Sequence, residues 1–256
     1  MILFFAMRAV VRIVLLVIVI GVGALCVLLL GFVPIRVRGA RLATWPVVLM
    51  ARLFMPIAGV DYACPAPDLV RNHHGLIFCN HTSFIDTLMV LYLTPARFLS
   101  TQGVRKLPVI GQIAIALETI FLNRRSQDAR AASRTEIAQA LRAHTYPPLV
   151  LFPEGTIGPG HTMLPLRHGA FEIAQQEQLP ILPRALCYEP LDVMTWYDKK
   201  ATLPALTWRL VMQRARVKAH LLPLPTLTPA PAADIAEVAE QTRQLIQAAL
   251  DKAKLS

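Results

Sequence analysis

The sequence predicts an α/β domain, a largely parallel or mixed sheet flanked by helices, which follows an N-terminal membrane-anchoring helical segment. The domain is predicted because short apolar runs alternate along the chain with amphipathic segments, the pattern of strands that alternate with helices. The anchor is predicted because residues 13–33 include no charged residue, in a chain that is 55% hydrophobic with a mean hydropathy of +0.49. The length of 256 residues suffices for one domain with a full core and an additional element.

The first expected element is a hydrophobic helix over residues 13–33. It would be ~31 Å long, close to the hydrocarbon thickness of a bilayer. The apolar run is longer than that of a cleaved signal peptide, and residues 31–34 are a poor cleavage site, which favours a retained anchor. Arginines flank the run and are in excess on its carboxyl side, so the domain is expected on the cytoplasmic face of the cell membrane. These arginines are Arg8 and Arg12 before the run, and Arg36, Arg38, Arg41 and Arg52 after it.

A second apolar stretch covers residues 42–60 and is interrupted by Pro46, Arg52 and Pro56. A second membrane span would bury Arg52 at a cost of a few kcal/mol, so we interpret the stretch as a helix in the membrane interface, with Trp45 at headgroup level. A hairpin that keeps both helices in one leaflet is an alternative that the sequence does not exclude. Residues 1–60 are thus expected to form the anchor and residues 61–256 the globular domain.

Within the globular part, residues 61–72 contain prolines and are interpreted as a linker. Strands are expected at the short apolar runs 75–79, 97–100, 120–122, 149–152, 181–187 and 217–222. Helices are expected at 84–93, 126–144 and 167–176, and from residue 234 onward. Two prolines follow the last strand and indicate an edge position.

The formal net charge of +10 indicates an anionic partner. The apolar composition and the absence of a nucleic-acid-binding motif favour anionic lipid over nucleic acid. The cysteines are Cys26, Cys64, Cys79 and Cys187, and without a C-x-x-C pair they are expected to be reduced thiols.

The segment Asn80–Asp86 has the first candidate for chemistry, a histidine five residues before an aspartate. On one regular helix His81 and Asp86 would be about 140° apart, so they meet only if His81 lies on the turn before the helix and Asp86 in its first turn. Asp86 would then orient the imidazole, whose other nitrogen would take a proton from a substrate hydroxyl. The alternative is structural, with Ser83 and Asp86 as a helix-capping pair and His81 in a loop. Since no G-x-S-x-G motif is present, the attacking group is expected to be the substrate's own alcohol.

Other candidates follow further along the chain. Arg124 comes after a short apolar run and suits bidentate phosphate binding, or it is a surface arginine. Glu154, Gly155 and Thr156 follow a buried strand, where ligands gather in open α/β sheets, or they form an ordinary turn. Arg167 adds a cation near that turn, at the start of a helix.

A zinc site is the rival interpretation of one group of residues. His73, His74, Cys79 and His81 are potential ligands, but their spacing fits neither H-x3-5-H nor C-x-x-C. No metal is expected.

Taken together, four motifs resemble the glycerolipid acyltransferase family, specifically the 1-acyl-sn-glycerol-3-phosphate (lysophosphatidic acid) acyltransferases. They are N-H-x-S-x-x-D at 80–86, x-x-F-x-x-R at 119–124, F-P-E-G-T at 152–156 and P-I-L-P at 180–183. The chain departs from the family pattern at Glu118, where glycine is usual, at Ile157, where Arg or Ser is usual, and at Leu166-Arg167, where Phe-Lys is usual.

The resemblance implies a membrane-bound O-acyltransferase that makes phosphatidic acid from lysophosphatidic acid, with His81 as general base oriented by Asp86. It implies no cofactor, acyl-CoA or acyl carrier protein as donor, a lysophospholipid acceptor, and a hydrophobic tunnel for the acyl chain, with residues 180–183 as a candidate wall. Another lysolipid, such as a lyso-ornithine lipid or lysophospholipid, is an alternative acceptor, and a catalytically silent lipid-binding protein is an alternative function. The residues expected to bind substrate are Asn80, Ser83, Phe121, Arg124, Glu154, Gly155, Thr156 and Arg167.

Overall fold

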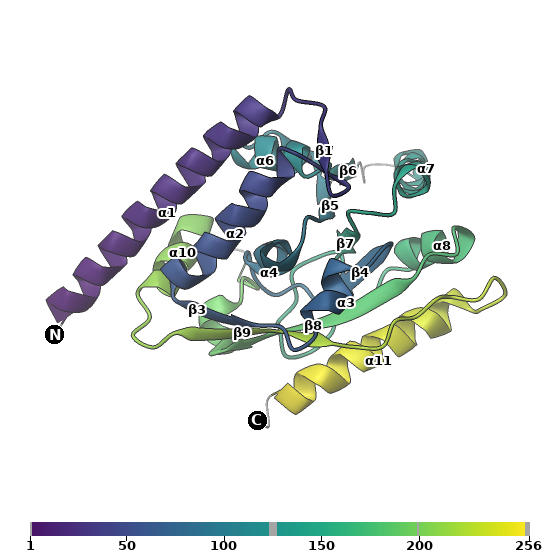
Figure 1. Cartoon of the computed structure of the whole chain (residues 1–256). Helices are drawn as coiled ribbons and strands as arrows, with labels where there is room; N and C mark the ends of the chain where they lie inside the picture. Colours follow the sequence, from purple (N-terminus) through teal and green to yellow (C-terminus); the bar gives the residue numbers. More distant parts are fainter. Residues whose placement is uncertain (1, 123–126, 199, 254–256) are drawn as a thin grey trace.

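The computed structural model describes residues 2–122, 127–198 and 200–253 and has a mixed seven-stranded sheet with helices on both faces (Figure 1). The strand order is β3-β9-β8-β4-β7-β5-β6, and neighbouring strands are parallel except for the antiparallel pair β8 and β9. The predicted fold class is therefore confirmed. The strands of this sheet are β3 (Val60–Ala63), β4 (Leu76–Cys79), β5 (Arg97–Thr101), β6 (Ile120–Leu122), β7 (Leu149–Leu151), β8 (Ile181–Glu189) and β9 (Val217–Pro223).

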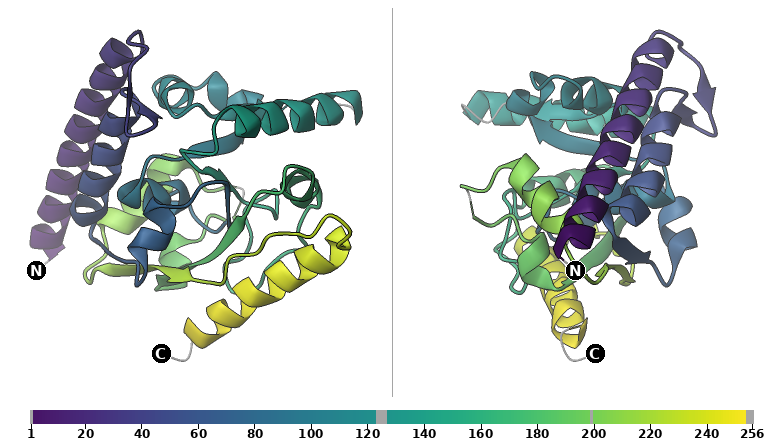
Figure 2. Two further views of the ribbon diagram at one scale, coloured as in Figure 1. Left: turned by 45° about the vertical axis from the view of Figure 1, so that its right-hand side comes forward. Right: turned by 90° about the vertical axis from the view of Figure 1, so that its left-hand side faces the viewer.

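The helices form two layers and an N-terminal pair (Figures 1 and 2). They are α1 (Ile2–Leu30), α2 (Thr44–Ala58), α3 (Pro67–Arg71), α4 (Asp86–Leu93), α5 (Gln102–Arg105), α6 (Ile110–Ala116), α7 (Gln127–Ala143), α8 (Gly169–Gln176), α9 (Leu191–Met194), α10 (Leu203–Val211) and α11 (Ile235–Ala253). A separate two-stranded ribbon, β1 (Arg36–Val37) with β2 (Ala40–Arg41), joins α1 to α2.

The sheet separates two cores because side chains along each strand alternate between its faces. In β4, Ile77 and Cys79 belong to the core shared with α1, α2, α4 and α10, whereas Leu76 and Phe78 belong to the core under α7, α8 and α11. All four are buried, as expected for an interior strand covered on both sides. The central strands therefore present their carboxyl ends at a rigid edge, where the candidate motifs lie.

The linker predicted at 61–72 is wrong. Residues 60–63 form β3, which pairs in parallel with β9, and residues 67–71 form α3. For the same reason the strand at 217–222 is not at the edge: β9 lies between β8 and β3, and β3 is the edge strand. The pairing joins Val60 to Val217, a contact so distant in sequence that local patterns contain no sign of it.

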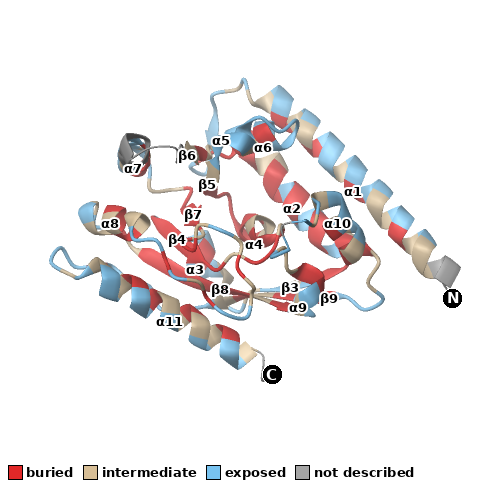
Figure 3. Cartoon of the chain, turned by 180° about the vertical axis from the view of Figure 1, so that it is seen from behind, coloured by how far each residue is buried: buried red, intermediate tan, exposed pale blue. Residues whose placement is uncertain are grey.

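The first helix begins earlier than predicted and includes two arginines. Arg12 Nη1 donates to the carbonyl of Val211 at 2.9 Å, and the guanidinium of Arg8 donates to the carbonyls of Gln213 and Arg214. These bonds attach the amino-terminal half of α1 to the end of α10. One side of α1 packs along α2, while its outer side leaves apolar residues exposed (Figure 3). Residues 5–30 are long and apolar enough to cross a membrane.

The second helix is also present, at Thr44–Ala58, and ends at Gly59, whose backbone is left-handed (φ 85°). One face of α2 is buried against α1 and α4, and Leu49 and Leu53 lie on the exposed face. Its location in the membrane interface stays a prediction.

Candidate functional site

The turn between β4 and α4 brings His81 and Asp86 together. His81 Nδ1 lies 2.6 Å from Asp86 Oδ2, and the same oxygen accepts the backbone N–H groups of Thr82 (2.7 Å) and Ser83 (3.0 Å). The Asp86 side chain is fully buried. Because Asp86 is the first residue of α4, its carboxylate reaches back over the turn, which is the geometry that the five-residue spacing requires.

Only half of the helix-capping alternative is present: Asp86 Oδ2 accepts the Ser83 N–H group, but no side chain caps the start of α4 in return. The residue before α4 is Ile85, which makes no side-chain cap, and the hydroxyl of Ser83 is buried without a hydrogen-bond partner among the described residues. The N–H groups of Thr82 and Ser83, just before the helix, both donate to Asp86.

An aromatic ring packs against the face of the His81 imidazole, while Asp86 holds its edge. The imidazole stacks on Phe152, with ring centroids 4.1 Å apart and an interplanar angle of 17°. About a quarter of the His81 side chain is exposed (24%), and the side chain lines an apolar cavity that is described below. With Nδ1 held by Asp86, Nε2 is the nitrogen left for a substrate proton.

Two further polar side chains hold the backbone of this turn. Glu154 is buried, and its carboxylate accepts the N–H groups of His81 (2.9 Å) and Leu164 (3.0 Å). Burial raises the pKa of the Glu154 carboxyl, an effect that these two donors oppose. The Asn80 amide pairs with both backbone groups of Leu186 on β8, at 2.9 Å and 2.7 Å. Glu154 and Asn80 were predicted to bind substrate, but their polar groups are engaged by the protein.

The glycine turn after β7 brings a cation to the same edge of the sheet. Gly155 has a left-handed backbone (φ 71°), and a Cβ there would lie 2.2 Å from Arg167 Nε, so the absence of a side chain lets Arg167 pack over the turn. Arg167 and Thr156 are both exposed. They are open to a ligand, in contrast to Glu154.

The second motif is described only in part. Phe121 lies on β6, its carbonyl accepts a hydrogen bond from Gln102, and the Arg105 guanidinium lies 5.6 Å from its ring centroid. Arg124 lies outside the described residues. Glu118, which replaces the family's usual glycine, keeps a left-handed backbone (φ 53°) and pairs with Arg36. Glu118 therefore has a backbone conformation that glycine adopts without steric cost.

An apolar cavity of about 660 Å³ opens beside His81. Its size lies within the usual range of ligand sites, about 300–1,000 Å³. The lining comes mainly from α1, α2, α4, β5 and α6, and includes Leu16, Met50, Leu91, Phe98 and Ile113. Trp196, which follows α9, and residues of α10 also contribute. The lining is almost entirely hydrocarbon, which suits an alkyl chain. Residues 180–183, the candidate wall, are not among the described residues that line it.

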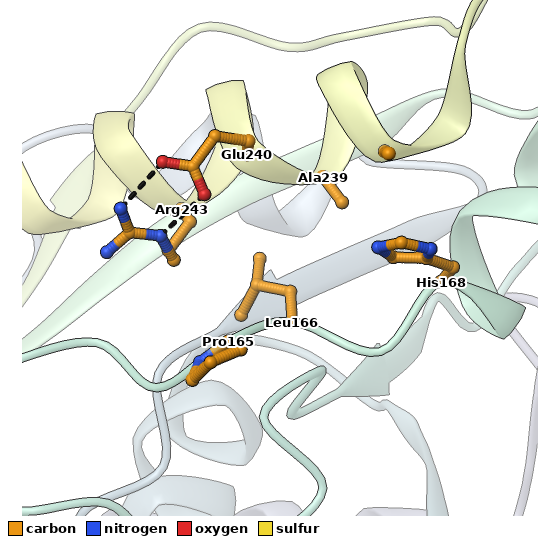
Figure 4. Close-up of a pocket in the computed structure, with 7 residues that line it drawn as sticks. Pro165, Leu166, His168, Ala239, Glu240 and Arg243 are labelled. Carbon is orange, nitrogen blue, oxygen red and sulfur yellow. Dashed lines mark hydrogen bonds and ion pairs between the residues drawn. The ribbon is translucent and has the colours of Figure 1, made fainter.

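A smaller pocket of about 320 Å³ lies elsewhere, between α11 and the segment before α8 (Figure 4). His168 and Leu166 line it, and Glu240 and Arg243 pair with each other beside it. It contains none of the predicted site residues. We place the candidate site at the larger cavity because His81 lies there.

The histidines considered for zinc have other partners. His73 Nε2 lies 2.9 Å from the Leu76 carbonyl, and His74 Nδ1 lies 3.3 Å from Thr145 Oγ1. Within the described ranges, no three His, Cys, Asp or Glu side chains form a metal-binding group.

Tyr188 touches Asp86 but was not among the residues predicted from the sequence. The hydroxyl of Tyr188, on β8, donates to Asp86 Oδ1. The two residues are far apart in sequence, so no local motif reveals the contact. A buried tyrosine on an apolar strand is the only signal, because such a hydroxyl needs a partner.

Comparison with known proteins agrees with this geometry. The acyltransferase family model matches residues 64–186. A 1-acyl-sn-glycerol-3-phosphate acyltransferase of Neisseria gonorrhoeae is 27% identical over 165 residues, which cover 62% of this chain and 63% of that protein. A lyso-ornithine lipid O-acyltransferase of Brucella abortus (strain 2308) is 30% identical over 126 residues, which cover 45% of this chain and 46% of that protein.

A solved structure has the same fold across the chain. It is the 1-acyl-sn-glycerophosphate acyltransferase PlsC from Thermotoga maritima, which aligns with a TM-score of 0.69 and 18% identity over 99% of this chain and 96% of that chain. The chain spans less than two thirds of the curated relatives that it matches, from 18% to 63% of their lengths. The stretch that matches the acyltransferase family includes both the His81–Asp86 turn and the glycine turn, and in this region the chain is similar to 1-acyl-sn-glycerol-3-phosphate acyltransferases.

Proposed function

We propose that this protein is a membrane-bound O-acyltransferase that transfers a fatty acyl group from acyl-CoA or acyl carrier protein to the free hydroxyl of lysophosphatidic acid, giving phosphatidic acid. The observation that carries the proposal is the His81–Asp86 pair, 2.6 Å apart, whose histidine lines an apolar cavity of about 660 Å³. A base beside a hydrocarbon-lined space suits a reaction between an alcohol and a fatty acyl thioester.

In the proposed reaction, His81 Nε2 takes the proton of the acceptor hydroxyl as its oxygen attacks the thioester carbonyl carbon. Asp86 holds the imidazole in the required tautomer and stabilises the imidazolium that forms. The carbon–sulfur bond then breaks, the thiolate leaves, and the imidazolium returns the proton to it. No bond to the protein forms, so no protein nucleophile is needed.

The acceptor head group would lie at the cationic edge of the site. Arg167 and Thr156 are exposed beside the glycine turn, and Arg124 stays our expected ligand for the phosphate. A lyso-ornithine lipid is the second candidate acceptor, which the similarity to the Brucella abortus enzyme favours.

We propose that the protein binds the cytoplasmic face of the cell membrane through α1 and α2 as a hairpin in one leaflet. Two contacts support this arrangement over a spanning α1. The amino-terminal half of α1 is attached to the end of α10 through Arg8 and Arg12, and the helix also packs against α6. A helix that crossed the bilayer would have to carry one end away from the domain.

The test is acyl transfer by washed membranes that contain the protein, with labelled acyl-CoA and acyl carrier protein as donors. The acceptors are lysophosphatidic acid, a lyso-ornithine lipid and a phosphate-free lysolipid. We expect the highest kcat/KM with lysophosphatidic acid. A preference for lyso-ornithine lipid would replace the acceptor and keep the mechanism, whereas binding of all lysolipids without transfer would support a silent lipid-binding protein and contradict the proposal.

A further inference from the structure

Tyr188 contacts the Asp86 carboxylate from the opposite side to His81. It lies on β8, and its hydroxyl donates to Asp86 Oδ1 and lies 3.0 Å from the sulfur of Met89. A hydroxyl has one proton to donate, and a carboxylate oxygen is a much better acceptor than a thioether. The Tyr188 hydroxyl therefore donates its hydrogen bond to Asp86 and not to Met89. The tyrosine is buried (9% exposed) and does not line the cavity.

The hydrogen bonds of Asp86 are divided unequally between its two oxygens. Oδ2 accepts from His81, Thr82 and Ser83, all within the same turn. For Oδ1, Tyr188 is the hydrogen-bond donor among the described residues. Because the Asp86 side chain is fully buried, water does not readily replace this donor, and its loss would leave a carboxylate oxygen unsatisfied in the core.

Strand β8 holds both ends of the catalytic turn. Leu186 pairs with the Asn80 amide before His81, and Tyr188 contacts Asp86 after it. The two β8 residues are two positions apart, so their side chains lie on one face of the strand. The strand thus sets where the turn begins and how the carboxylate is rotated.

We propose that Tyr188 is a positioning residue for the His81–Asp86 pair: its hydroxyl fixes the rotation of the Asp86 carboxylate and draws part of the negative charge towards Oδ1. The proposal rests on the proposed acyl transfer only for its kinetic readout. Without the hydroxyl, more negative charge would face the imidazole and stabilise its protonated form. The base would then lose its proton only at a higher pH.

Other ionisable groups face this pair and stay unchanged in the test. They are Cys79 from β4 and Glu154 after β7, with Arg184 of β8 beside Cys79 and Tyr62 of β3 beside Tyr188. Burial raises the pKa of the Cys79 thiol, so it carries no charge near neutral pH. Tyr62 also provides a matched control, because its hydroxyl is buried but has no hydrogen-bond partner among the described residues.

The test compares Tyr188→Phe with Tyr62→Phe in the full-length, membrane-bound protein. For Tyr188→Phe we expect kcat to fall between about 10-fold and 100-fold, with KM for the acceptor unchanged, because a displaced orienting group costs rate without touching bound substrate. The acidic limb of its pH–rate profile should move to higher pH. Tyr62→Phe should keep the wild-type kcat and the wild-type limb.

A second readout does not depend on acyl transfer. Diethyl pyrocarbonate modifies neutral imidazole, so its rate of reaction with His81, followed by peptide mass spectrometry against pH, should move in the same direction in Tyr188→Phe and stay in place in Tyr62→Phe. A profile that is unmoved or displaced to lower pH, or an equal change in Tyr62→Phe, would overturn the role of Tyr188. If the wild-type protein transferred no acyl group, the proposed function would fail while this readout still decided the role of Tyr188.

Discussion

At the scale of residues, the site is built from carboxylates that bind the protein's own groups. The Asp86 carboxylate accepts hydrogen bonds from the His81 imidazole and from two backbone N–H groups. The Glu154 carboxylate accepts hydrogen bonds from the backbone N–H groups of His81 and Leu164. One carboxylate therefore fixes the imidazole and the other fixes the backbone of the same residue. His81 is held at both ends before any substrate arrives, which is how a general base gains its precise placement.

Glu154→Gln tests the structural role of the glutamate. The amide retains one acceptor oxygen, so either His81 or Leu164 would lose its partner and leave a buried N–H group unsatisfied. We expect the free energy of unfolding to fall by about 1–3 kcal/mol. We also expect acyl transfer to fall with an unchanged KM for the acceptor. Thermal unfolding and steady-state kinetics measure the two effects.

Glu172→Gln is the control for this variant, since Glu172 makes an exposed ion pair with Arg134 that contributes about 0–1 kcal/mol. It should leave both measurements near the wild type. A raised KM in Glu154→Gln with no loss of stability would instead return Glu154 to the substrate-binding group that the sequence predicted.

The sequence predicted the His81–Asp86 pair because its two members are close along the chain. The hydrogen bonds of Glu154 and Asn80 to the protein backbone were not predictable, because their partners lie in other segments of the chain. The contact of Tyr188 with Asp86 was not predictable for the same reason. The sequence motifs are compatible with side chains that bind substrate and with side chains that bind the protein backbone. Only the folded structure distinguishes these two roles.

At the scale of elements, apolar runs located the interior strands β4, β7 and β8 because burial on both faces leaves a continuous signal. The edge strand β3 was missed because it is short, includes Asp61 and is followed by prolines. Its pairing with β9 across more than half of the chain decides its structure. The helices α5, α6, α9 and α10 were also not predicted.

The helix α6 provides a direct test of the cavity. Ile113 lines the cavity, whereas Ile115, on the same helix, is exposed and does not. Ile113→Trp should fill part of the space and lower kcat/KM for long acyl donors by at least about 10-fold relative to short ones, since a few methylene groups in a hydrophobic pocket are worth that much. Donors of graded chain length, in one competition assay, measure the ratio.

Ile115→Trp makes the same substitution on the exposed side of α6 and should leave the chain-length profile unchanged. Equal profiles for Ile113→Trp and the wild type, with both proteins folded, would mean that the acyl chain binds elsewhere.

At the scale of the whole molecule, the net charge of +10 and the exposed apolar side of α1 are consistent with the membrane attachment that we propose. The helix is about 44 Å long, longer than the hydrocarbon core, yet it lies along the domain (Figure 2). We therefore expect a tag fused before Met1 and a tag fused after Ser256 to be on the same side of the membrane. Both should be accessible to protease in inverted vesicles and protected in intact spheroplasts.

The tag after Ser256 reports the side of the domain and serves as the internal control. An amino-terminal tag that is protected in inverted vesicles and digested in spheroplasts would show that α1 crosses the bilayer. The hairpin in one leaflet would then be wrong.

Transfer to lysophosphatidic acid by His81→Ala in washed membranes tests whether His81 is the general base for acyl transfer to a lysolipid. Loss of a general base typically costs 10²–10⁴-fold in rate. We expect a loss of about that size, with the same membrane-bound amount and the same thermal unfolding as the wild type, because the imidazole stacks on Phe152 at the cavity and is not part of the core. Near-normal turnover by His81→Ala would contradict the account.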